Sequence, residues 1–206
     1  MTKTEKIVPL KPPVGQRSDK RRERILKALH HCILDKGYAK TTLTDVAKVA
    51  DMYPSHLLYY FKGKDAILEH YFQNVADKIL VRIDGFRNEE PERQIELLTE
   101  LFFAGKGITK SEIGFMLECF GVAVNDKELR RQKSDLDEQC KAYLVELFEK
   151  TPRRFLADTG DSAEIAYSIL IGLRTAVYFD EDLSLREATR LFHTAMLNMA
   201  GIEQGN

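Results

Sequence analysis

Hydrophobic residues recur at spacings of three and four along most of the chain, and the alternation typical of strands is nearly absent. The pattern therefore predicts an all-α protein. The first predicted helix runs from Ser18, a candidate cap, to Gly37, which is expected to end it in the left-handed conformation. Its apolar side is expected to consist of Ile25, Leu26, Leu29, Ile33 and Leu34.

Two short helices around a tight turn are predicted next. The first begins at Thr42, which stands three residues before Asp45 as in a capping box, and ends at Asp51. Its inward-facing residues are expected to be Leu43, Val46, Ala47 and Ala50.

The second short helix begins at Pro54, because the fixed φ of proline suits the first helical position. Its core-facing residues are expected to be Leu57, Leu58 and Phe61. Hydrogen-bond donors and flat rings remain on or near the outer face: Ser55, His56, Tyr59 and Tyr60. A helix of about two turns fits a DNA major groove roughly 12 Å wide.

Several short motifs stand at fixed spacing within about residues 20 to 70: Thr41-Thr42, Asp45-Val46-Ala47, Leu57-Leu58-Tyr59-Tyr60-Phe61 and Lys64-Asp65-Ala66-Ile67-Leu68. With these motifs the region resembles the amino-terminal DNA-binding domain of the tetracycline-repressor-like (TetR) family. The family usually has Gly in the turn and Ser or Thr capping the recognition helix, where this chain carries Asp51 and Tyr53. Asp tolerates a left-handed turn better than most residues, and Pro54 preorganises the first helical turn.

The resemblance implies that the partner is double-stranded DNA. Side chains suited to phosphate oxygens by chemistry and motif position are Thr41, Thr42, Tyr59 and Lys64. The candidates for contact with base edges are Ser55, His56 and Tyr60. Three of these have structural alternatives, since Thr42 also suits a cap, Tyr60 also suits packing under the helix, and His56 also suits a solvated surface.

Charge is distributed unevenly along the chain. Residues 1–65 contain 14 Lys and Arg against 7 Asp and Glu, and the remainder contains 17 against 25. A basic segment joined to an acidic body is typical of a DNA-binding head, although charge alone also describes a solvated surface. The predicted divisions are a disordered basic arm (1–17), a helix-turn-helix domain (18–65) and a helical effector-binding and dimerisation domain (66–206). The arm is either a plain extension or a segment that lies along the minor groove.

The body is predicted to be helical throughout. A helix from Lys64 to about Ile83 joins it to the head without a flexible spacer, and a loop covers 151–160. The expected starts of the other helices are Pro91, Thr109 (with Glu112), Asn125 (with Glu128) and Ser184 (with Glu187).

The last two helices are the most apolar part of the body. The first should be buried nearly all round, with one face formed by Ile165, Ile169, Gly172, Leu173 and Ala176. The final helix carries a stripe formed by Ala188, Leu191, Phe192, Ala195, Met196 and Met199. The resemblance implies that these helices form a homodimer through a four-helix bundle, and an intramolecular core is the alternative. Arg174 is expected to meet an acidic side chain across the dimer or, as the less favoured alternative, a ligand carboxylate.

Aromatic residues of the body are candidates for a cavity between helices, although such residues are more often ordinary core. The candidate ligand-binding residues are Phe102, Phe103, Phe115, Met116, Phe120, Tyr143, Tyr167 and Tyr178. The resemblance implies a ligand-responsive transcriptional regulator, with repression favoured, that binds a palindromic operator as a dimer. A small apolar or aromatic effector would release it. The alternative is a helical small-molecule-binding or scaffold protein whose head no longer binds DNA specifically.

Other functional classes find little support. The longest apolar stretch, Ile165 to Phe179, is interrupted by polar residues and is shorter than the roughly 20 residues of a membrane span. Met1 to Gln16 shows no signal-peptide pattern, so a cytoplasmic location is expected, with Cys32, Cys119 and Cys140 as buried reduced thiols. A redox-sensing role of Cys119 is a minor alternative. The sequence shows no catalytic or metal-binding motif, and no enzyme activity, metal or cofactor is expected.

Overall fold

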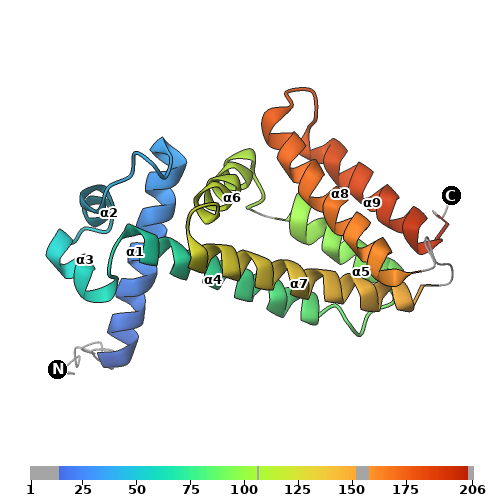
Figure 1. Cartoon of the computed structure of the whole chain (residues 1–206), viewed down its shortest axis with the longest axis horizontal. Helices are drawn as coiled ribbons and strands as arrows, with labels where there is room; N and C mark the ends of the chain where they lie inside the picture. Colours follow the sequence, from blue (N-terminus) through green and yellow to red (C-terminus); the bar gives the residue numbers. More distant parts are fainter. Residues whose placement is uncertain (1–13, 106, 152–157, 204–206) are drawn as a thin grey trace, which may run out of the picture.

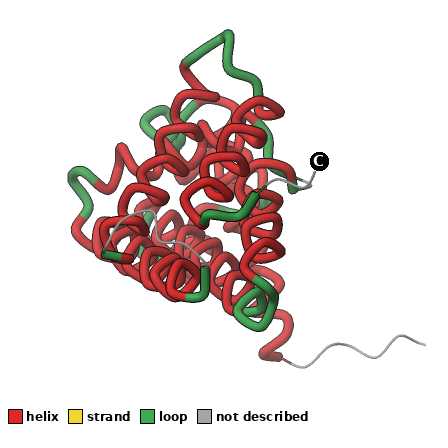
Figure 2. The backbone as a smooth tube through the Cα atoms, turned by 90° about the vertical axis from the view of Figure 1, so that its right-hand side faces the viewer, coloured by secondary structure: helices red, strands yellow, loops and turns green. Residues whose placement is uncertain are grey.

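The computed structural model describes residues 14–105, 107–151 and 158–203, and these residues form helices and no strand, as predicted. The elements are α1 (Val14–Lys36), α2 (Leu43–Val49), α3 (Pro54–Tyr60), α4 (Lys64–Asp84), α5 (Pro91–Thr99), a π-helical turn η1 (Glu100–Ala104), α6 (Lys110–Ala123), α7 (Lys127–Glu149), α8 (Thr159–Phe179) and α9 (Leu185–Ala200). Seen end-on, the described part of the chain consists of helices joined by loops (Figure 2).

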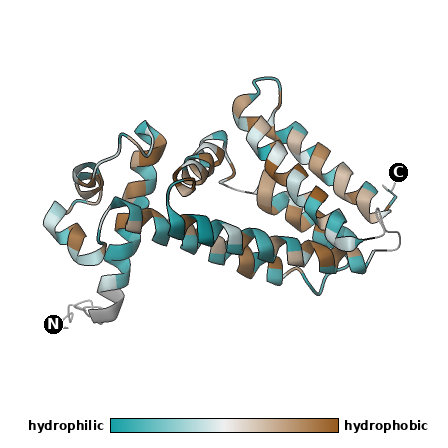
Figure 3. Cartoon of the chain, viewed as in Figure 1, coloured by the Kyte–Doolittle hydropathy of each residue, from teal (hydrophilic) through white to brown (hydrophobic). Residues whose placement is uncertain are grey.

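The molecule has a small head and a larger body (Figure 1). Helices α1, α2 and α3 form the head at one end, and α4 leaves the head and runs alongside α7 into the body. Helices α5, α8 and α9 pack together at the far end, and α6 lies between these and the head. Helix α6 is mainly hydrophobic, whereas the first part of α7 is mainly hydrophilic (Figure 3).

The core of the head follows the hydrophobic pattern with two exceptions. Ile25, Leu29 and Leu57 are fully buried. Leu34 and Leu58, however, are 39% and 51% exposed, so the prediction that they face the core was wrong. The long helix α1 and the short helices α2 and α3 enclose a narrow core, and only the central positions of each apolar stripe reach it.

The ends of the head helices were predicted in part. Gly37 has φ 78° and its N–H donates to the Ile33 carbonyl at 2.8 Å, which confirms the left-handed stop. Thr42 and Asp45 form the reciprocal capping box that the sequence predicts. Ser18 lies inside α1, which begins at Val14, so its predicted capping role was wrong.

Asp51 takes the left-handed conformation in the turn between α2 and α3, with φ 50°. Arg24 supports this turn from α1: its Nε donates to the Ala50 carbonyl at 2.5 Å and its Nη2 to the Asp51 carbonyl at 2.8 Å. The following helix begins at Pro54 as predicted, and Tyr53 precedes it without a side-chain cap. The turn is therefore held by the Arg24 guanidinium and by the rigid Pro54 ring.

The body helices begin close to the predicted positions. Pro91 opens α5, and Thr109 and Ser184 cap α6 and α9 by accepting from the N–H three residues later. The predicted cap at Asn125 was wrong, because Asp126 accepts from the Leu129 N–H at 2.8 Å. Both residue types are good caps, and the helix begins one residue later than predicted.

Helices α8 and α9 keep apolar residues on their outer sides. Phe179 is 71% exposed, Ile165 and Leu191 are partly exposed, and a Cβ at Gly172 would meet no atom within 4 Å. The prediction that α8 is buried nearly all round was therefore wrong for the single chain. No helix of the described residues has the length and apolarity needed to cross a membrane.

Candidate DNA-binding face and effector cavity

Helix α3 presents an open, largely polar outer face. Ser55 and His56 are exposed, and Tyr59 is 84% exposed. The Tyr53 and His56 rings meet edge to face, with centroids 5.8 Å apart. The predicted base-contacting and phosphate-contacting residues of α3 thus share one surface, with Leu57 as the buried anchor beneath them.

Tyr60 lies at the edge of this surface and is half-buried. Its hydroxyl accepts from Arg21 Nη1 at 3.2 Å, and the Arg22 guanidinium lies 5.9 Å from its ring centroid. Its ring therefore contacts α1, and its hydroxyl points toward basic side chains of the same face.

Three of the predicted phosphate-contacting residues have partners within the head. Thr41 is buried, and its hydroxyl donates to the Gly37 carbonyl at 2.8 Å. The Thr42 hydroxyl bonds to Asp45 in the capping box. Lys64 Nζ donates to the carbonyls of Tyr38 and Thr41 at 2.9 and 3.0 Å. These side chains hold the turn between α1 and α2 and the start of α4, and only Thr42 of the three is exposed.

Sequence reasoning missed several residues of this face. Tyr53, Arg21, Arg24 and Lys48 line the same concave surface as His56 and Tyr59. Tyr53 could have been identified from its position directly before Pro54, because the side chain that precedes this helix start lies outside the core. The basic residues were visible only as a general excess of charge.

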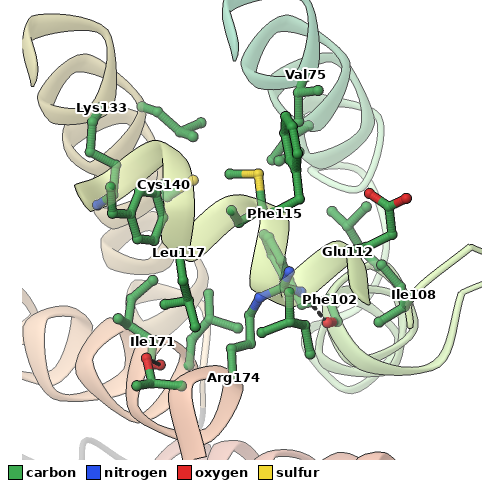
Figure 4. Close-up of a pocket in the computed structure, with 18 of the residues that line it drawn as sticks. Val75, Phe102, Ile108, Glu112, Phe115, Leu117, Lys133, Cys140, Ile171 and Arg174 are labelled. Atoms are coloured by element: carbon green, nitrogen blue, oxygen red, sulfur yellow. Dashed lines mark hydrogen bonds between the residues drawn. The ribbon is translucent and has the colours of Figure 1, made fainter. Parts of the chain in front are cut away.

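The body contains a cavity of about 240 Å³ enclosed by α4, η1, α6, α7 and α8 (Figure 4). The predicted residues that line it are Phe102, Phe115, Met116, Phe120 and Tyr167. Tyr71 of α4 and Leu170 of α8 also line it and were missed. Tyr71 stood in a part of the sequence that was interpreted only as the helix joining head and body.

Three predicted cavity residues lie elsewhere. Phe103 packs against Phe192, with ring centroids 5.0 Å apart. Tyr143 is buried, and its hydroxyl donates to Gln94 Oε1 at 2.6 Å. Tyr178 is partly exposed and lies against Gly114. All three are absent from the wall of the large cavity.

Charged groups line the cavity as well. Arg174 extends from α8 into the cavity, and its Nη1 donates to the Phe102 carbonyl at 2.5 Å (Figure 4). Burial lowers the pKa of this guanidinium. Lys133 is paired with Asp137 at 2.5 Å, and Glu112 with His30 at 3.0 Å.

The thiols are buried and free, as the sequence predicts. Burial raises the pKa of Cys119 and of Cys140 to about 12, so both are held in the unreactive protonated form at neutral pH. Cys140 also lines the cavity. Among the described residues, no group of three or more His, Cys, Asp and Glu is placed to hold a metal ion.

Helix α6 connects the cavity to the head. Glu112 lines the cavity and meets His30 of α1. The His30 ring forms a three-ring cluster with Tyr71 and Phe115, at centroid distances of 5.2 and 4.6 Å. Nearly two turns further along α6, Glu118 Oε2 accepts from the Tyr38 backbone N–H at 3.0 Å. The Thr109–Glu112 pair was predicted as a capping box, but only Thr109 caps, because the Glu112 carboxylate is directed to His30.

Comparisons with known proteins agree with this arrangement. The family model described as bacterial regulatory proteins, tetR family, matches residues 25–71. A regulator named BetI 2 from Chromohalobacter salexigens is 24% identical over 179 residues, which cover 84% of this chain and 86% of that protein. A BetI regulator from Stenotrophomonas maltophilia is 23% identical and covers 82% of this chain and 89% of its own length.

Solved structures share the fold. A TetR transcription regulator from Haloarcula marismortui has a TM-score of 0.78 at 17% identity, covering 90% of this chain and 100% of its own. A regulator from Saccharomonospora viridis, solved in complex with choline, has a TM-score of 0.76 at 16% identity, covering 85% and 95%.

An exposed recognition helix on a basic head, attached to a helical body with an internal cavity, defines a helix-turn-helix transcriptional regulator. The curated relatives are named HTH-type transcriptional regulators, which agrees with a role in the control of transcription. Within that class, residues 25–71 match the model of the TetR family, and the chain shares the fold of a solved TetR regulator.

Proposed function

We propose that the protein acts in the cytoplasm as a homodimeric repressor of a palindromic operator, and that a small apolar or aromatic molecule in the cavity releases it. The observation that carries the proposal is the shared helix α6, which forms a wall of the cavity and contacts the head at two points. Glu112 meets His30 of α1, and Glu118 meets the Tyr38 N–H in the turn after α1. A ligand that displaces α6 changes the support of the head. Ligand and DNA affinities are then linked, and each weakens the other by the same factor.

The dimer is proposed to form through α8 and α9. Their outer sides carry exposed apolar residues, and the open surface at Gly172 allows close approach of a second helix. A twofold pair places two α3 helices against half-sites about 34 to 36 Å apart, so a small change in head separation loses one half-site.

The DNA contacts proposed here are those of exposed residues. Tyr59 and Thr42 are assigned to phosphate oxygens, and Ser55 and His56 to base edges, with Tyr60 at the rim. Thr41 and Lys64 are assigned a supporting role, because their polar side-chain atoms bond to backbone carbonyls of the head. His56→Ala is expected to reduce discrimination between operator and random DNA, and equal loss on both would remove His56 from base reading.

The test is selection of genomic fragments bound by the full chain, followed by release with candidate small molecules. Two variants separate the functions. Tyr59→Ala should lose DNA and keep ligand binding, whereas Met116→Trp, which fills the cavity, should keep DNA and lose the response to ligand. If the chain retains no fragment above random DNA, the scaffold alternative holds instead.

A further inference from the structure

We propose that the effector is a compact amphipathic anion, an apolar ring or short chain that ends in a carboxylate, and that Arg174 binds this carboxylate. The inference rests on the proposed effector function of the cavity and specifies the chemistry of its ligand.

Arg174 is a cation without a counter-ion. One Nη1–H donates to the Phe102 carbonyl, and among the described residues no carboxylate lies within ion-pair distance of the guanidinium. A buried charge is costly unless it is paired, and the remaining N–H groups of a guanidinium match the two oxygens of a carboxylate. The guanidinium extends into the cavity (Figure 4), not toward the outer side of α8 where a second subunit is proposed to pack.

The other charges of the cavity wall favour the same sign of ligand. The carboxylate of Glu112 is engaged by His30, and the ammonium of Lys133 by Asp137. Arg82, an exposed residue of α4, also lines the cavity. Arg82 and Arg174 are therefore the basic groups of the wall that have no ion-pair partner among the described residues, and Glu112 is the one acidic group of the wall and is hydrogen-bonded to His30.

The rest of the wall sets the size and polarity of the ligand. Phe115, Phe120 and Leu170 supply apolar surface to the cavity wall. The volume of about 240 Å³ exceeds the roughly 150 Å³ of a cavity that accommodates benzene. One ring with a two- or three-atom chain and a terminal carboxylate fits this space.

A cationic ligand such as choline is the main competitor, because aromatic rings also attract cations. In this chain the competitor faces the repulsion of Arg174, and the carboxylate that would offset its charge, Glu112, already meets His30 at 3.0 Å. The balance of charges therefore favours the anion.

The test measures binding of 3-phenylpropanoate, its uncharged amide 3-phenylpropanamide, and choline to the full chain by calorimetry. We expect the acid to bind roughly tenfold or more tightly than the amide, since hydrogen bonds to charged groups are the strong ones. Arg174→Met should bring the acid-to-amide ratio close to one, and Arg174→Lys should restore part of it. Melting curves establish that both variants are folded, and removal of a buried charge is itself not expected to unfold the body.

Several outcomes overturn the anion proposal. Equal binding of acid and amide to the unaltered chain does so, as does an acid preference that survives in Arg174→Met. If choline binds and Met116→Trp abolishes this binding, the anion proposal is also overturned, but the cavity remains the effector site. If none of the three probes binds, the anion proposal fails for a ligand of this size, and release of operator by larger compounds then decides the proposed function separately.

Discussion

The contact between His30 and Glu112 provides the sharpest test of coupling between cavity and head. The two side chains are 20% and 34% exposed, and Nε2 lies 3.0 Å from Oε2. Hydrogen bonds to charged groups contribute about 1.5 to 3 kcal/mol, and partial exposure reduces this to about 1 kcal/mol. A contact of that strength, made in only one state of the head, changes the ratio of the two states about fivefold.

The perturbation is Glu112→Gln, with His30→Phe as the second arm. Phenylalanine retains a flat ring against Tyr71 and Phe115 but cannot form a hydrogen bond to residue 112. Operator affinity is measured by fluorescence anisotropy with and without ligand for both single variants and the double variant. The ligand-induced change in affinity is expected to shift about fivefold in each single variant, and the double variant should show little further change.

An exposed ion pair on α7 serves as the control. Glu128 meets Arg131 at 2.6 Å and is absent from the cavity wall, so Glu128→Gln should leave the ligand response unchanged. If the effects of Glu112→Gln and His30→Phe simply add, or if both leave the ligand response intact, α6 does not transmit the signal through this contact.

Further predictions concern the head and the thiols. Leu57→Ala is expected to lower the free energy of unfolding by about 2 to 5 kcal/mol, measured by urea unfolding. Leu58→Ala on the same helix should change it by less than about 0.5 kcal/mol. Similar losses of stability in both variants would contradict the assigned burial. Tyr59→Phe should weaken the affinity for operator and for random DNA to a similar extent in anisotropy titrations. A loss of affinity confined to operator would assign the Tyr59 hydroxyl to a base instead. At pH 8, alkylation of Cys119 and Cys140 should be about a thousandfold slower than that of an ordinary thiol, because their raised pKa leaves little thiolate. Ligand in the cavity should slow the alkylation of Cys140 further. Rapid labelling of either thiol in the folded protein would refute its burial.

Local signals made much of the head predictable. Gly37, the Thr42–Asp45 box and Pro54 each act within one helical turn, so their effects are present in the sequence itself. The exposure of Leu58 could not be predicted in this way, because periodicity gives the direction of an apolar stripe and not how much of its width the neighbouring helices cover.

The cavity was predicted only in outline. Phe115 and Phe103 carry the same side chain at helical spacing, yet one lines the cavity and the other packs against Phe192. The difference depends on which helices meet around each ring, which is a tertiary property. Arg174 was recognised as unusual in an apolar helix, but its direction into the cavity depends on the free carbonyl of Phe102 in η1.

Helix α4 has the geometry of a lever arm between the two halves of the molecule. Its 21 residues run unbroken from the head into the body, and Tyr71, Val75 and Ile79 on this helix line the cavity. A helix of that length measures about 31 Å, so a tilt of about 5° about one end carries the other end nearly 3 Å. A sub-ångström adjustment beside the pivot is thereby magnified into a displacement comparable to the rise of one DNA base pair.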